Sequence, residues 1–263
     1  MTAPTDLLTD TNGPVRTLTL NRPDAKNSLT ASMLRSLMAA LYEADTDPTI
    51  RVIILTNSGN TFCAGADLTA DRPGVAAMIG GPSEKPASLA ELFVSMQSGA
   101  TPIIGRIDGH AVGGGVGLVA ACDLSYVRSD AKIGFTEVRL GVAPAVISVV
   151  CLPKLSRADA METFLSGERF SPTKAAEIGL INAAVAPENL HQHVDATVNK
   201  ILKGGPSGIA AAKNLVYTVP TMDRAEALAW TTELSQALFD SEEAKAGIAA
   251  YRQRRPAPWD ESS

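Results

Sequence analysis

Two glycine-rich segments have the residue types needed to bring backbone N–H groups up to a bound ligand. The first, residues 62–68, directly follows an apolar run, and its small side chains allow close approach to the backbone. The second, residues 108–117, precedes a stretch of small residues that we expect to be helical. Backbone N–H groups at a helix start are unpaired and lie at the positive end of the helix dipole. Two such segments converging on one point would stabilise an oxyanion.

Other interpretations of these glycines stay open at this point. A glycine-rich turn before a helix is also a packing device that needs no ligand. Residues 115–120 match the Gly-x-Gly-x-x-Ala pattern of dinucleotide-binding turns, but the match begins inside the expected helix. A nucleotide-dependent oxidoreductase would also need an acidic residue for the ribose, and we find none at a suitable place.

The elements around the first segment follow the alternation of an α/β fold. Residues 15–20 alternate apolar and polar side chains, which predicts a half-buried strand. The Asn12-Gly13 turn signal before it predicts a hairpin with residues 7–8 in the first arm. Thr30 is the expected N-cap of a helix, and residues 51–56 predict a strand buried on both faces of a parallel sheet. The apolar face of that helix comprises Met33, Leu34, Leu37 and Leu41.

Further along, the chain changes from mixed to helical character. We expect strands at 103–107 and 124–127, and helices at 89–98 and 113–122. From about residue 156 helical segments dominate, so the chain divides into an α/β core and a helical C-terminal part. We predict a core domain over residues 1–195 and a helical domain over 196–263. The expected later helices are 157–165, 173–178, 190–202, 209–216, 224–239 and 242–254. Residues 71–86, rich in glycine and proline, are expected to form a mobile flap.

Composition excludes several classes of protein. The 263 residues are 45% hydrophobic and carry a net charge of −5, which argues against a general nucleic-acid binder. We find no apolar run of roughly 18 residues to span a membrane and no signal peptide, so we expect a cytoplasmic protein. The three cysteines are expected to be reduced and buried. The histidines form no set of metal ligands, and we predict no metal.

Several motifs occur together along the chain. They are Asn21-Arg22-Pro23, Ala64-Gly65-Ala66-Asp67, residues 109–115, Cys122-Asp123-Leu124, Phe135-Thr136-Glu137, Leu140-Gly141, and the ending from Glu243 through Gly247 to Arg255 and Trp259. Their order is typical of the enoyl-CoA hydratase and isomerase group, the crotonase family, which the sequence resembles over about residues 6–260. The resemblance implies an α/β fold with a crotonase-type spiral of ββα turns and a helical C-terminal domain. It implies an acyl-CoA substrate, no separate cofactor, and a homotrimer or dimer of trimers.

The resemblance also implies roles for individual residues. The N–H groups of Ala66 and Gly114 match the oxyanion donors. The expected cradle for coenzyme A comprises the loop from Ala25 to Asn27 with Ala64, Asp67 and Leu68. Within it, Lys26 is a candidate phosphate contact or, alternatively, a solvated surface lysine.

Catalysis depends on how many glutamates the site contains. Hydratases of the family use two glutamates, and Glu137 matches one of them. Without the resemblance, a single glutamate in a loop would be interpreted as part of a surface salt bridge. The other would stand at Gly117, which has no side chain to activate water. The chain is still expected to add water to a 2-enoyl-CoA, with the water held by Glu137 alone or by a small anion or backbone group that fills the gap. The alternatives are a 3-enoyl-CoA to 2-enoyl-CoA isomerase and a non-catalytic acyl-CoA binder. Residues 115–118, 136–141 and 144–148 resemble a subgroup that contains methylglutaconyl-CoA and related branched-chain hydratases, which favours hydration.

Overall fold

The computed structural model describes residues 5–67 and 88–260. The expected flap at 71–86 lies outside the described residues. Within them, two sheets with strand orders β1-β2-β3-β5-β7-β10 and β4-β6-β8-β9 combine with helices, so the predicted α/β class is confirmed.

The larger sheet contains the predicted strands. Strands β1 (Leu7–Asn12) and β2 (Val15–Leu20) form the expected antiparallel hairpin, with Asn12 paired to Val15 across the turn. Strands β3 (Val52–Asn57), β5 (Ile103–Ile107), β7 (Leu124–Arg128) and β10 (Ala183–Val185) extend the sheet in parallel. Every residue of β3 is buried, as its continuous apolar run predicts.

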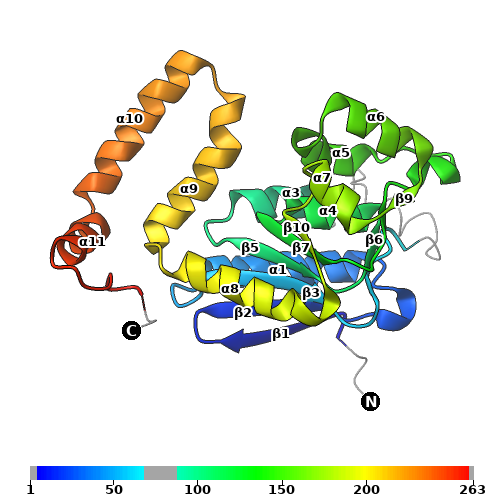
Figure 1. Ribbon diagram of the computed structural model, residues 1–263, viewed down its shortest axis with the longest axis horizontal. Coiled ribbons are helices and arrows are strands. Elements are labelled where there is room, and N and C mark those ends of the chain that lie inside the picture. Colours follow the sequence, from blue (N-terminus) through cyan, green and yellow to red (C-terminus); the bar gives the residue numbers. More distant parts are fainter. Residues whose placement is uncertain (1–4, 68–87, 261–263) are drawn as a thin grey trace.

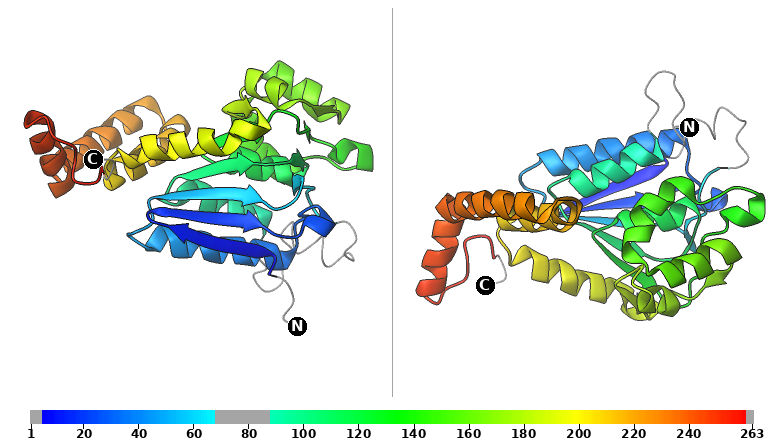
Figure 2. Two further views of the ribbon diagram at one scale, coloured as in Figure 1. Left: turned by 60° about the horizontal axis from the view of Figure 1, so that its bottom comes forward. Right: turned by 90° about the horizontal axis from the view of Figure 1, so that it is seen from above.

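Helices cover both faces of this sheet. Helix α1 (Ala31–Thr46) begins where the Thr30 hydroxyl accepts a hydrogen bond from the Met33 N–H at 3.1 Å, so the predicted cap is confirmed. Helix α3 (Leu89–Ser98) begins with a capping box of Ser88 and Glu91. Figure 2 shows α1 and α3 on one face and α8 (Leu190–Leu202) on the other.

The sequence analysis did not identify the smaller sheet. Its strands β4 (Thr61–Cys63), β6 (His110–Val112), β8 (Ile133–Gly134) and β9 (Arg169–Phe170) have two or three residues each, too few to show a period. Strand β4 pairs with β6 in parallel. This pairing brings the two glycine-rich segments side by side, with α4 (Gly114–Ala121) starting directly after β6.

The expected helices of the second half are confirmed, with ends shifted by at most a few residues. Helices α9, α10 and α11 project to one side of the core (Figure 1). The expected domain boundary at 195/196 falls within α8, whose Val194 and Val198 pack in one apolar cluster on the sheet, and the division stays a prediction. The bounds are α5 (Ala145–Cys151), α6 (Arg157–Ser166), α7 (Pro172–Glu177), α9 (Pro206–Thr218), α10 (Arg224–Asp240) and α11 (Glu242–Arg252).

Two further expectations concern membranes and thiols. No helix of the described ranges is both long enough and apolar enough to cross a bilayer. Cys63, Cys122 and Cys151 are free and buried, as predicted.

Candidate active site

The two glycine-rich segments meet at Gly65. Its φ of +84° is a conformation that favours glycine, and a Cβ there would lie 3.1 Å from the Gly114 nitrogen and 3.2 Å from the Val112 carbonyl oxygen. A Cβ on Gly115 would collide with the Cys63 carbonyl. The glycines therefore permit direct contact between two backbones, and the predicted convergence of the segments is confirmed.

The N–H groups of Ala66 and Gly114 are both available at this junction. The bridge between Leu29 and Ala66 uses the flanking groups: the Leu29 N–H donates to Gly65 O at 2.7 Å, and the Asp67 N–H donates to Leu29 O at 3.1 Å. Gly114 is the first residue of α4, where an N–H has no partner within the helix. Over residues 5–67 and 88–260, neither N–H donates to a backbone carbonyl. Two backbone donors are thus held beside Gly65 without a backbone acceptor among the described residues.

The Glu137 carboxyl lies against the same backbone. Glu137 is the first residue of the short helix η2 (Glu137–Leu140), and a Cβ on Gly113 would lie 3.3 Å from its Oε1. Its Oε2 is buried and has no hydrogen-bond partner among the described residues. Burial raises the pKa of the Glu137 carboxyl above its ordinary value of 4.5. A desolvated carboxyl beside two free donors suits proton transfer.

The turn after α6 fixes η2 in place. The Arg139 guanidinium donates to the Ser166 carbonyl at 3.4 Å and lies 3.7 Å from the Glu168 carboxylate. A Cβ on Gly167 would lie 2.8 Å from a Val138 methyl, so the turn packs closely on the helix that begins with Glu137.

The loop predicted to bind coenzyme A is built around a buried asparagine. The Asn27 side chain accepts from the Arg22 N–H at 2.6 Å and donates to the carbonyls of Ser58 and Thr61 at 3.0 and 2.7 Å. Asn27 is fully buried, and its φ of +50° closes the turn. These bonds attach the loop to the segment leading into β4.

The structure brings most of the predicted cradle together. The Ala64 N–H donates to the Lys26 carbonyl at 3.0 Å, which places Ala25 and Lys26 beside the first glycine-rich segment. Lys26 is exposed, and the Asp67 carboxylate lies 3.3 Å from the Arg22 guanidinium. Leu68 lies outside the described residues.

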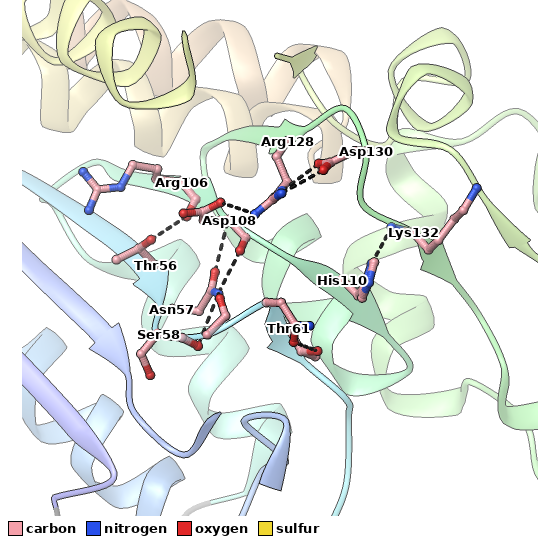
Figure 3. Close-up of polar contacts among 12 residues, drawn as sticks. Thr56, Asn57, Ser58, Thr61, Arg106, Asp108, His110, Arg128, Asp130 and Lys132 are labelled. Atoms are coloured by element: carbon pink, nitrogen blue, oxygen red, sulfur yellow. Dashed lines mark hydrogen bonds and ion pairs between the residues drawn. The ribbon is translucent and has the colours of Figure 1, made fainter. Parts of the chain in front are cut away.

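A polar cluster fixes the start of the second segment (Figure 3). The Asn57 side chain at the end of β3 donates to the Asp108 carbonyl at 3.1 Å and accepts from its N–H at 3.0 Å. The Arg128 guanidinium pairs with the carboxylates of Asp108 and Asp130. His110 accepts from the Lys132 N–H, a structural bond and not a metal contact. No group of three or more His, Cys, Asp or Glu suited to a metal occurs in the described part of the chain.

The space at Gly117, expected as a gap, is filled by apolar side chains. A Cβ there would lie 2.5 Å from Ile147 Cγ2 and 2.6 Å from Phe93 Cζ. Phe93 and Ile147 are almost fully buried. Sequence reasoning did not place either residue at the site, because each comes from a separate helix. A glutamate at this position would displace both.

Comparison with known proteins identifies the family. The family model described as Enoyl-CoA hydratase/isomerase matches residues 10–262. The chain belongs to this family. The family prediction made from the motifs is therefore confirmed.

Enoyl-CoA hydratase/isomerase family members of similar length resemble the whole chain. It is 33% identical to a probable enoyl-CoA hydratase of Rhizobium meliloti, over 95% of this chain and 96% of the relative. It is 32% identical to the (E)-benzylidenesuccinyl-CoA hydratase of Thauera aromatica, over 90% and 92%. The crystal structure of an enoyl-CoA hydratase from Mycobacterium smegmatis superposes with a TM-score of 0.88 at 31% identity, over 97% of this chain and 98% of that one. The crotonase-type fold is thereby confirmed.

Proposed function

We propose that the protein adds water across the double bond of a 2-enoyl-CoA thioester. The observation that carries this proposal is the buried Glu137 Oε2, which has no hydrogen-bond partner among the described residues. It lies beside the Ala66 and Gly114 N–H groups, which have no backbone acceptor there. Hydratases among the relatives support the same class of reaction.

In the proposed mechanism the thioester oxygen accepts hydrogen bonds from Ala66 and Gly114. Negative charge grows on this oxygen as the enolate forms, so the two donors bind the transition state more strongly than the substrate. The oxygen of water bonds to Cβ, and its proton passes to the Glu137 carboxylate. The carboxyl then gives a proton to Cα, which returns Glu137 to its starting state.

The remaining roles follow from the family. Ala25, Lys26, Ala64, Asp67 and Leu68 would cradle coenzyme A, with Lys26 as a phosphate contact. Coenzyme A is part of the substrate, and we propose no further cofactor.

The proposed setting is a cytoplasmic homotrimer or dimer of trimers. We assign residues 1–195 to the catalytic core and residues 196–263 to a helical domain for trimerisation. Helices α9, α10 and α11, which project from the core, would supply the contacts.

A second candidate, isomerisation of 3-enoyl-CoA to 2-enoyl-CoA, is favoured by the apolar enclosure of Gly117. One carboxylate suffices for it, because the same group can remove a proton from Cα and return it to Cγ.

A spectrophotometric assay separates these possibilities. The wild-type protein is incubated with crotonyl-CoA or 3-methylglutaconyl-CoA, and the 2-enoyl absorbance is followed. Loss of absorbance with at least one of the two substrates is the expected result. Gain of that absorbance from a 3-enoyl-CoA, without loss from either 2-enoyl-CoA, would establish the isomerase instead. Acyl-CoA binding with neither change would indicate a non-catalytic binder.

A further inference from the structure

Helix α3 runs beside α4 from the oxyanion donor to Gly117. Gly114 and Gly117 are three residues apart, so they lie on one face of α4, about 4.5 Å apart along its axis. A Cβ on Gly114 would lie 3.6 Å from Leu89 Cδ2, whereas a Cβ on Gly117 would meet the Phe93 ring, one turn further along α3. Phe93 therefore lies about one turn beyond the point where the thioester oxygen would bind.

Helix α5 closes the same region from the Glu137 side. Ile147 packs on Gly117, and Cys151 lies one turn further along α5. Burial raises the pKa of the Cys151 thiol to about 12, while the Lys154 charge lowers this pKa and the Glu137 charge raises it. One face of α5 thus extends from the neighbourhood of the catalytic carboxyl to the Phe93 ring.

These positions fix where the acyl chain must lie. The thioester oxygen is held at Ala66 and Gly114, and Cα must be within reach of Glu137. From there, we propose that Phe93 and Ile147 form the wall that contacts the substituent on Cβ and determines which acyl groups the enzyme accepts. This inference rests on the proposed function for the identity of the ligand as an acyl-CoA.

The chemistry of the wall defines the preferred substrate. Both side chains are apolar, and both pack tightly enough that Gly117 has no room for a Cβ. Such a wall favours a hydrogen or a small alkyl group on Cβ. It disfavours a bulky ring for lack of space, and a carboxylate because a buried unpaired charge is costly.

The test measures binding, so that it does not depend on turnover. Dissociation constants of butyryl-, isovaleryl-, 3-phenylpropionyl- and glutaryl-CoA are determined by isothermal titration calorimetry. The wild-type protein should bind the two small alkyl acyl-CoAs more tightly than the other two. In Phe93→Ala and Ile147→Ala, the ratio of 3-phenylpropionyl-CoA to butyryl-CoA affinity should rise by about 10-fold or more.

Milder and control variants keep the test decisive. Ile147→Val, which removes one methylene and preserves most of the packing, should raise the same ratio by about 4-fold. Phe93→Leu removes a net three carbons, so its increase should be larger. Val94→Ala and Val149→Ala are matched controls on the same two helices, since their parent side chains are 65% and 71% exposed. The controls should leave the ratio unchanged.

The outcomes separate this inference from the proposed function. If the ratio of 3-phenylpropionyl-CoA to butyryl-CoA affinity stays within twofold of wild type in all four variants of Phe93 and Ile147, these residues do not form the wall. That result would leave the proposed hydration intact. A shifted ratio in a protein that hydrates no 2-enoyl-CoA would support the wall and overturn the hydratase. Failure to bind any acyl-CoA would overturn both.

Discussion

The polar groups at the two ends of α4 differ in whether they have hydrogen-bond partners. At the amino end the Gly114 N–H has no backbone partner among the described residues, and the adjacent Glu137 Oε2 is buried without one. At the carboxyl end Asp123 uses both carboxylate oxygens. Oδ2 accepts from the Ile103 N–H at 2.7 Å and from Lys213 Nζ at 2.9 Å, and Oδ1 accepts from the Tyr217 hydroxyl at 3.0 Å.

Helix α3 repeats the contrast. Its first turn lies beside Gly114, whereas the Met96 carbonyl in its last turn accepts from Lys213 Nζ at 2.8 Å. Lys213 also donates to the Thr101 carbonyl at 3.1 Å. Helices α3 and α4 thus each have one end at the candidate active site. The other end lies in a hydrogen-bonded network of Asp123, Lys213 and Tyr217, which connects both helices to α9. Buried polar groups left unpaired suit a bound reactant, and fully paired ones hold the fold.

Removing the cation from the network at the carboxyl end of α4 should have the largest effect on stability. Lys213→Met leaves the Asp123 carboxylate and two carbonyls without their cation, so the free energy of unfolding should fall by about 3–5 kcal/mol. Urea denaturation checks this. The exposed Lys200 provides a control, Lys200→Met, which should change stability by less than about 0.5 kcal/mol. A loss no greater than the control's would contradict the structural role of the network.

A smaller loss is expected at the enclosed glycine. Gly117→Ala forces a methyl group against Phe93 and Ile147 and should lower stability by about 1–3 kcal/mol. Gly208→Ala in α9 is the matched helical control, because the nearest atom to its Cβ would be 3.9 Å away. That change should raise stability by about 0.4–1 kcal/mol. Equal effects of the two substitutions would show that Gly117 is not enclosed.

Removing the charge of Glu137, which lies beside the amino end of α4, should stabilise the protein slightly. Glu137→Gln removes a desolvated charge, so near neutral pH the free energy of unfolding should rise by about 1 kcal/mol. Since the folded pKa is raised, the folded state binds the proton more tightly, and the wild type loses stability as pH rises from 4.5 through that pKa. The gain should therefore be complete above the raised pKa and disappear below about 4.5.

Denaturation of both proteins across this pH range measures the difference. Glu168→Gln, which alters an exposed carboxylate, should show no such gain. A Glu137→Gln protein less stable than wild type at neutral pH would mean that the carboxylate stabilises the fold.

The sequence predicted those features that depend on neighbouring residues. The Thr30 cap, the buried β3 run and the helix at 89–98 are local patterns, and all are confirmed. The short strands β4 and β6 were missed because pairing, not periodicity, defines them. The roles of Phe93 and Ile147 and the bonds of Lys213 were missed for the same reason, since their partners lie far away in the sequence. The motif containing Asp123 marked one end of the network without indicating its partners.

The catalytic role of Glu137 is tested most directly by the rate of crotonyl-CoA hydration by wild type and by Glu137→Gln. Loss of the 2-enoyl absorbance is followed for both proteins at one protein concentration. The wild type should show measurable hydration, and the kcat of the variant should be lower by about 10²–10⁴-fold. The Kd for butyryl-CoA should be unchanged, which shows that the variant still binds the ligand. Equal rates in the two proteins would contradict the assignment of Glu137 as the catalytic acid and base.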